Sequence, residues 1–134
     1  MMIKRIAHVA YLVNDMKKTL AFYELAFGFK PKFTLNDDQG QPWIVYVEVA
    51  KEQFIELFYT NDKVAFLPNQ TYNHLCFEVT GIKEFVHQLK QKGIKIKHDV
   101  ILGKDHNYQA WIDDPDGNPI ELMEYGKQAL QLNQ

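Results

Sequence analysis

Two histidines and two glutamates occur at matched intervals along the chain and could together support metal-assisted chemistry. His8 and Glu56 lie 48 residues apart, and His74 and Glu121 lie 47 residues apart. Neutral imidazoles and carboxylates suit a borderline divalent ion, and two of each form an N₂O₂ set that leaves positions open for water or substrate. A carboxylate beside the ion could also act as a general base. The spacing therefore predicts a metal site with a catalytic carboxylate.

Each of these side chains also has a purely structural interpretation. A histidine in a strand is often satisfied by hydrogen bonds in a core or groove. A glutamate between apolar neighbours could face solvent, because an unpaired carboxylate is costly to bury. A buried histidine–glutamate pair could also be structural. The repetition of the same spacing favours the metal site, since two carboxylates neutralise a divalent ion and lower the cost of burying it.

The alternation of apolar residues predicts which way the four side chains point. In the stretch YNHLCFEV, residues 72–79, the apolar residues alternate as the buried face of a strand does, which leaves His74 on the other face. In residues 8–13 the same alternation places His8 on the face opposite Val9, Tyr11 and Val13. In the strands that contain "FIEL" and "PIEL", it places Glu56 and Glu121 on the face opposite the isoleucine and leucine that flank each of them. We expect all four to face the concave side of a sheet, where a pseudo-twofold axis would bring them together.

An internal repeat supports this arrangement. An offset of 66 places His8 over His74, and an offset of 65 places residues 43–49 over 108–114 and "FIEL" over "PIEL". Each copy reads as strand, helix and three strands. We expect one α+β domain over residues 1–134, built from two βαβββ modules at about 3–60 and 71–125. The linker would be 61–70 and a short C-terminal tail 126–134. The modules would form a curved mixed sheet with helices on its outer face.

Local signals place the ends of the two helices. Asn14 or Asp15 could cap the first helix, and Thr80 the second. Gly28 and Gly93 follow the two helices, as expected for a left-handed C′ residue. Asp116-Gly117 in "DDPDGN" fits a tight hairpin turn. The expected buried faces are Met16, Leu20, Tyr23 and Phe27 in the first helix and Ile82, Phe85, Val86 and Leu89 in the second.

Composition excludes several classes of function. The chain has 134 residues, 46% hydrophobic and 24% charged, with a net charge of −2. We therefore expect a globular protein with no nucleic-acid partner. The N-terminus lacks the cleavage site of a signal peptide, and no run reaches the ~18 apolar residues that cross a bilayer, so no membrane association is expected. A lone Cys76 predicts a reducing, cytoplasmic location. His87, His98 and His106 are expected to lie outside the metal site.

The repeated βαβββ pattern, the strand histidines and the segments "FIEL" and "DPDGNPIEL" resemble the vicinal oxygen chelate superfamily, which includes glyoxalase I (lactoylglutathione lyase). The resemblance covers about residues 3–125. It implies the ligand order His8, Glu56, His74 and Glu121 around one divalent ion, and the N₂O₂ donor set suits Ni, Zn, Co, Mn or Fe. It implies a metal-dependent lyase or isomerase that acts on a hemithioacetal of methylglyoxal, or a similar vicinal-oxygen small molecule, through an enediolate. Glu56 and Glu121 would be the catalytic carboxylates. Exposed sheet edges and the resemblance together predict a homodimer.

The substrate-binding side of the resemblance departs from glyoxalase I. Bacterial glyoxalase I has an arginine four residues after the first histidine, where this chain has Leu12, and Asn61 lies one residue beyond the position of a family asparagine. We therefore expect glutathione to be a poor thiol here. Leu12, Phe58, Asn61 and Met123 are the candidate substrate-binding residues. Two alternatives stay open: an enzyme like methylmalonyl-CoA epimerase, which usually has glutamine at the Glu56 position, and a drug-sequestering protein like the bleomycin-resistance proteins, which usually lack the full ligand set.

Overall fold

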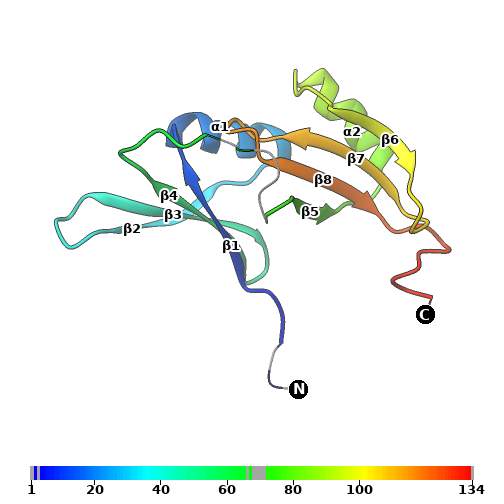
Figure 1. Cartoon of the computed structure of the whole chain (residues 1–134), viewed down its shortest axis with the longest axis horizontal. Coiled ribbons are helices and arrows are strands. Elements are labelled where there is room, and N and C mark those ends of the chain that lie inside the picture. The colour runs from blue at the N-terminus through cyan, green and yellow to red at the C-terminus, as the bar shows by residue number, and fades with distance from the viewer. Residues whose placement is uncertain (1, 3, 66, 68–71, 134) are drawn as a thin grey trace. The chain divides into compact units, whose positions relative to one another are not determined.

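The chain divides into two compact units that each contain one copy of the repeat. The computed structural model describes residues 2, 4–65, 67 and 72–133. Unit 1 is Met1–Ala65 and unit 2 is Phe66–Gln134. Each unit runs strand, helix and three strands (Figure 1), as the repeat predicts. Within the expected linker, Pro68, Asn69 and Gln70 lie outside the described residues.

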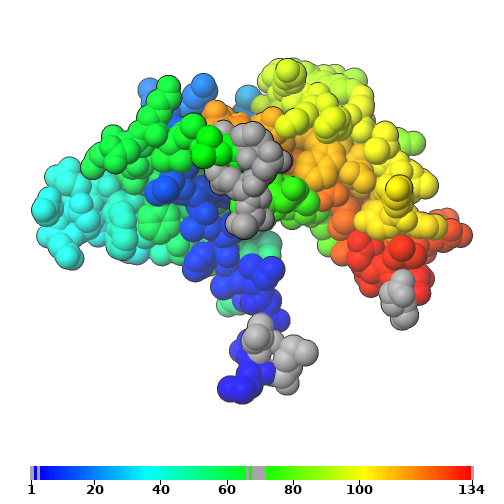
Figure 2. Space-filling view, viewed as in Figure 1, coloured from blue at the N-terminus to red at the C-terminus, as the bar shows by residue number. Residues whose placement is uncertain are grey.

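Unit 1 is a four-stranded sheet with one helix. Its strands follow the order β1-β4-β3-β2, with β1 parallel to β4 and the other pairs antiparallel. Every residue of the edge strand β2 is exposed, and the β2–β3 hairpin (cyan) lies at the surface in Figure 2. The elements are β1 (His8–Val13), α1 (Met16–Phe27), β2 (Pro31–Asn36), β3 (Pro42–Ala50) and β4 (Gln53–Tyr59).

Unit 2 repeats this topology with a second sheet of its own. The strand order is β5-β8-β7-β6, β5 is parallel to β8, and the remaining pairs are antiparallel. Helix α2 packs against β6, β7 and β8. The elements are β5 (Leu75–Glu78), α2 (Ile82–Gln91), β6 (His98–Leu102), β7 (Tyr108–Asp113) and β8 (Pro119–Glu124). The predicted α+β class with two βαβββ modules is confirmed, and hydrogen bonding gives each unit its own sheet.

The last strand of each unit contributes fully buried side chains to the hydrophobic core. Ile55 and Leu57 in β4, and Ile120 and Leu122 in β8, are at most 1% exposed. Because side chains alternate across a strand, the residue between them in each strand points to the other face. That residue is Glu56 in unit 1 and Glu121 in unit 2, so both carboxylates lie on the face predicted for them.

The helix ends agree with the sequence except at the start of α2, and Gly93 after α2 has the predicted left-handed φ of 79°. The Asp15 side chain accepts a hydrogen bond from the Lys18 amide, and Gly28 has a left-handed φ of 73°, as predicted. The expected Thr80 cap is wrong, because Gly81 is the N-cap and has no capping side chain. The Ile82 amide instead donates to Glu124 Oε2 at 2.7 Å. A carboxylate from β8 thus replaces the local cap.

One strand boundary and one buried helix face also differ from the sequence-based prediction. Strand β5 begins at Leu75, so His74 precedes the strand instead of lying inside it. In α1 the buried side chains include Thr19 and Ala26, whereas Leu20 and Phe27 are only partly buried. Small side chains at these positions allow close packing, while the Phe27 ring stacks on Phe29 with 5.2 Å between centroids. Within the described residues, no helix has the length and hydropathy needed to cross a membrane.

The predicted C-terminal tail is anchored on unit 2. Asn107, which is 1% exposed, donates from Nδ2 to Gln131 Oε1 at 2.8 Å and accepts from the Gly126 amide at 3.2 Å. A Cβ at Gly126 would lie 2.1 Å from the His106 carbonyl oxygen, so only glycine permits this approach. The tail therefore closes against the loop that precedes β7.

The "DDPDGN" turn between β7 and β8 is organised by one buried carboxylate. Asp114 is 5% exposed and accepts from the amides of Asp116 and Asn118 and from Asn118 Nδ2, at 2.8–2.9 Å. Burial raises the pKa of Asp114, while these hydrogen bonds oppose the rise. Gly117 supplies the positive φ of 85°. The turn joins β7 to β8 in the register that pairs Trp111 with Glu121.

We expect Asp114→Ala to destabilise the protein by about 2–3 kcal/mol, because buried donors lose their acceptor. Urea unfolding followed by circular dichroism would measure this loss. Asp38→Ala, at an exposed turn position of unit 1, is the control and should change stability by less than about 0.5 kcal/mol. Equal effects of the two variants would contradict the role given to Asp114.

Candidate functional site

In unit 1, the parallel pairing of β1 with β4 brings His8 to Glu56. Ala10 lies directly opposite Glu56 and His8 lies two residues earlier, on the same face. His8 Nδ1 is 3.4 Å from Glu56 Oε1. This distance is longer than an ordinary N–H···O hydrogen bond, so the imidazole and the carboxylate are neighbours without being firmly bonded.

Unit 2 forms the equivalent pair through the same register. Cys76 lies opposite Glu121, and His74 lies two residues earlier. His74 Nε2 is 3.0 Å from Glu121 Oε2, and its ring meets Trp111 edge-on at 4.7 Å between centroids. His74 Nδ1 is within hydrogen-bonding distance of Asn73 Oδ1. A proton on Nδ1 would donate to that amide oxygen and leave the Nε2 lone pair available to a ligand.

The carboxylate of Glu56 is buried, and among the described residues its basic neighbour is the His8 imidazole, with no lysine or arginine paired to it. Glu56 is 8% exposed, and its hydrogen bond to the Tyr46 hydroxyl, followed by burial and its negative charge, raises the pKa of Tyr46. The nearby cations are engaged elsewhere: Lys32 Nζ is 2.7 Å from Glu48, and Arg5 pairs with Glu52. Among the described residues no lysine or arginine forms an ion pair with Glu56. A bound cation would compensate this buried charge.

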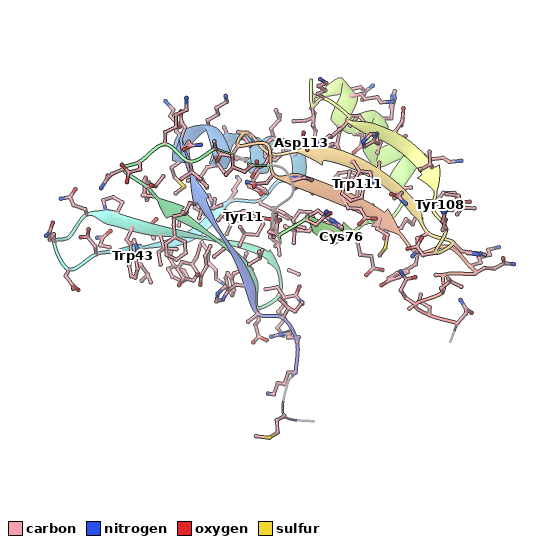
Figure 3. The ribbon with its side chains drawn as sticks, in the orientation of Figure 1. Tyr11, Trp43, Cys76, Tyr108, Trp111 and Asp113 are labelled. Carbon is pink, nitrogen blue, oxygen red and sulfur yellow. The ribbon has the colours of Figure 1, made fainter. Side chains whose placement is uncertain are left out.

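Glu121 has a different neighbour in the thiol of Cys76. Cys76 is an exposed residue of β5, but partial burial of its thiol, together with the charge of Glu121 and a hydrogen bond to it, raises the pKa of Cys76 to about 12. Cys76 on β5 and Trp111 on β7 come from the two strands that flank β8 (Figure 3). The thiol therefore stays protonated at neutral pH and acts as a weak donor to the carboxylate.

Each unit supplies one imidazole and one carboxylate, which is half of the predicted ligand set. In the part of the chain that the structure describes, His, Cys, Asp and Glu do not gather in groups of three or more that could hold a metal ion. Two ligands alone rarely hold a metal, because stable zinc-type sites use three or four protein ligands. The donor types and the uncompensated Glu56 carboxylate fit a divalent ion, provided that the two pairs meet on one ion.

An aromatic surface surrounds the unit 1 pair. Tyr46 lies directly opposite Glu56 in the sheet and stacks on Phe33 with 4.3 Å between ring centroids. Trp43, labelled in Figure 3, meets Phe58 edge-on at 5.9 Å. The sequence-based analysis missed Tyr46 as a contact of Glu56, because the signal was only its place opposite Glu56 in a neighbouring strand.

Three of the candidate substrate-binding residues lie on the same strand faces as the His–Glu pairs, and the fourth, Asn61, follows β4. Leu12, 54% exposed, pairs with Phe58 on the face that carries Glu56. Met123 shares the face of Glu121 two residues on, opposite Glu78. Asn61 is an exposed residue just after β4. His87 lies on α2, His98 begins β6 and His106 lies in the loop before β7, and none of the three contributes to either pair.

Unit 2 also has a hollow on the other face of its sheet. A groove of about 790 Å³ is lined by residues from the start of α2, the end of β8 and the tail, among them Lys83, Tyr108, Glu124 and Lys127. Glu124 lies three residues after Glu121, so alternation places it on the opposite face of β8. The groove is therefore separate from the His74–Glu121 pair.

We expect the Cys76 thiol of metal-free protein to react with iodoacetamide at pH 8 at least about tenfold more slowly than free glutathione, because the thiolate is the nucleophile and a pKa of about 12 leaves little of it. Mass spectrometry at timed intervals would give the rate. Glu121→Gln removes the negative charge and should speed the reaction, and the urea-unfolded chain should react like a free thiol. A folded protein that reacts as fast as glutathione would contradict the raised pKa of the Cys76 thiol.

Comparisons with known proteins identify the family of the chain. Residues 5–122 match the Glyoxalase/Bleomycin resistance protein/Dioxygenase superfamily. The chain is 26% identical over 124 residues to a lactoylglutathione lyase of Salmonella typhimurium, covering 90% of this chain and 92% of that protein. It is 25% identical over 126 residues to the fosfomycin resistance protein FosX of Listeria innocua, covering 90% of each.

A solved structure shares the fold. The glyoxalase family protein from Enterococcus faecalis matches with a TM-score of 0.80 at 25% identity, over 92% of this chain and all of that one. The superfamily match spans both βαβββ units and includes His8, Glu56, His74 and Glu121. With the repeated fold and this match in agreement, the chain belongs to the Glyoxalase/Bleomycin resistance protein/Dioxygenase superfamily.

Proposed function

We propose that this protein is a metal-dependent lyase or isomerase of the glyoxalase I type, which acts on a hemithioacetal or another small substrate with two adjacent oxygens. The observation that carries the proposal is the pair of equivalent His–Glu sites, His8 with Glu56 and His74 with Glu121, at the same register in the two units. The four side chains would hold one divalent ion, either Ni, Zn, Co, Mn or Fe.

The chain's own residues then have distinct tasks. When bound, the ion would supply Lewis-acid stabilisation for negative charge on the two substrate oxygens. The imidazoles of His8 and His74 would serve as neutral ligands. A carboxylate, Glu56 or Glu121, would take a proton from the substrate carbon and return it to the neighbouring carbon. The apolar surroundings of Glu56 would keep bulk water from that proton.

The substrate arm is expected to be uncharged or to carry a thiol other than glutathione. Leu12 faces the side that carries Glu56 and has no charge to offer a carboxylate. Of the described basic residues of unit 1, Lys32 and Arg5 are paired with Glu48 and Glu52. The aromatic side chains around Glu56 favour an apolar arm.

We also propose a homodimer, since the strand β2 is a fully exposed edge.

Two other functions compete with this proposal. An acyl-CoA epimerase would use the same proton transfer on a larger, anionic substrate. A drug-binding protein would need no metal, and one relative is named for fosfomycin resistance. The His–Glu pair in each unit favours a metal enzyme over sequestration, because drug binding does not require the same two donor types at equivalent positions of both units. Metal-reconstituted protein should be assayed with methylglyoxal plus several thiols, and with acyl-CoA epimers.

We expect His74→Ala and Glu121→Ala to lose stoichiometric metal and at least about 100-fold of turnover, while circular dichroism shows the fold intact. The reason is that each variant removes a direct ligand and leaves the other member of the His74–Glu121 pair without its partner. His87→Ala, an exposed residue of α2, is the matched control and should keep both metal and activity. Full metal occupancy in either site variant would show that these residues are not ligands.

We expect a high KM for the glutathione hemithioacetal of methylglyoxal and a ten- to hundredfold lower KM in Leu12→Arg. A charge-assisted hydrogen bond to a glutathione carboxylate is worth about 1.5–3 kcal/mol, which corresponds to that range. Steady-state kinetics of both proteins decide the matter, with Leu25→Arg, an exposed leucine of α1, as the control. A wild-type KM in the low micromolar range would contradict this expectation.

A further inference from the structure

The face of the unit 2 sheet that carries the core is left open at one end. Ala110 and Leu122 lie opposite each other on this face and are both 0% exposed. One row further toward the tail, Tyr108 lies opposite Leu102 on one side and Glu124 on the other, and alternation puts this row on the same face. Here Leu102 is 59% exposed and Tyr108 38% exposed. The end row therefore presents apolar surface that α2 does not cover.

This open row belongs to the groove of about 790 Å³ in unit 2. The first turn of α2 supplies Lys83 and Glu84 to the groove, and the tail supplies Lys127 and Gln128. Tyr108, labelled in Figure 3, comes from the start of β7. A volume of this size is typical of sites that bind small molecules, which combine apolar surface with a few polar groups.

The two lysines of the groove carry positive charge without an acidic partner. The lysine and arginine ion pairs in the described part of the chain involve Arg5, Lys30, Lys32, Lys90 and Lys97. Lys83 Nζ instead lies over the Tyr108 ring, 6.0 Å from its centroid, a cation–π contact. Lys83 and Lys127 can therefore both serve an anionic ligand.

The carboxylates that line the groove are already hydrogen-bonded. Glu124 accepts from the Ile82 amide at 2.7 Å and so occupies the N-terminus of α2. Glu84 accepts from Gln88 Nε2 at 3.1 Å. Neither carboxylate forms an ion pair with a lysine among the described residues, so the positive charge of Lys83 is not cancelled by contact.

Contacts behind the groove hold its walls in place. The bond from Ile82 to Glu124 ties α2 to the end of β8. On the tail side, the Leu130 amide donates to the Asp105 carbonyl at 3.0 Å, and Ala129 is 0% exposed. A site whose walls are already fixed spends less binding free energy on ordering them when a ligand arrives.

We propose that this groove binds a small aromatic carboxylate, with its ring on Leu102 and Tyr108 and its carboxylate held by Lys83 and Lys127. The exposed apolar row accounts for the ring, and the two lysines from opposite walls account for the anion. The inference goes beyond the proposed function and does not depend on it, because the groove and the His74–Glu121 pair lie on opposite faces of β8.

A titration of the ¹⁵N-labelled full chain with 1-naphthoate, followed by NMR, tests the site. We expect a Kd of about 1 mM or lower, as is usual for a ligand of this size, and shifts centred on the amides of Lys83, Tyr108 and Lys127. The uncharged 1-naphthalenemethanol and inorganic phosphate should each bind at least about tenfold more weakly. Equal affinity for the alcohol would overturn the role of the lysines, and equal affinity for phosphate would overturn that of the apolar row.

Exposed lysines contribute modestly, so Lys83→Gln and Lys127→Gln should each weaken 1-naphthoate binding about threefold, and the double variant about tenfold. Leu102→Ser should weaken it by a similar factor to one lysine. Lys95→Gln, an exposed lysine outside the groove, is the matched control and should leave the Kd unchanged. No binding by the wild type, shifts confined to β1, β4 and β5, or an unchanged Kd in the double variant would each overturn the proposal.

Discussion

The parallel pairing of the first and last strands in each unit determines where every candidate ligand lies. In unit 1 the pairing of Ala10 with Glu56, and in unit 2 that of Cys76 with Glu121, brings a histidine two residues upstream onto the face of the glutamate. A shift of one residue would turn each glutamate to the other face of its sheet. The fully buried Ile55 and Leu57, and Ile120 and Leu122, oppose such a shift. The same apolar burial that stabilises each sheet therefore places its acid and its base.

The repetition of this pairing gives the site its chemical logic. One imidazole and one carboxylate form a weak metal site, and a buried carboxylate without a cation is costly. Two such pairs on one ion would supply four ligands and balance the charge of a divalent metal. Each unit is then incomplete as a catalyst by itself, although it has a sheet and a core of its own. The two structurally similar units differ in the residue opposite each carboxylate, which is Tyr46 for Glu56 and Trp111 for Glu121.

Much of the fold could be predicted from the sequence, because its signals are local. Alternating apolar residues gave the strands, Asp15 and Gly28 marked the ends of α1, and the fixed offset between "FIEL" and "PIEL" gave the two units. The second helix was less predictable, since Gly81 offers no side chain and the capping carboxylate, Glu124, comes from a strand 42 residues away. Long-range contacts of that kind leave no trace in a local pattern.

The candidate ligands were likewise predictable, while the groups around them were not. His8, Glu56, His74 and Glu121 stand out by type and spacing, but Tyr46 and Cys76 look like ordinary strand residues. Their roles depend on which strand lies beside which, and on a register that only the folded sheet fixes. The sequence therefore predicts the chemistry better than it predicts the hydrogen bonds that tune it.

The number of divalent ions that each chain binds tests the central claim most directly. Equilibrium dialysis of the purified protein against Zn²⁺, followed by elemental analysis, gives this number. The account predicts one ion per chain, because the His8–Glu56 and His74–Glu121 pairs would share a single ion. Two ions per chain would mean that the pairs bind independently, and no bound ion would mean that they are not ligands; either result would contradict the account.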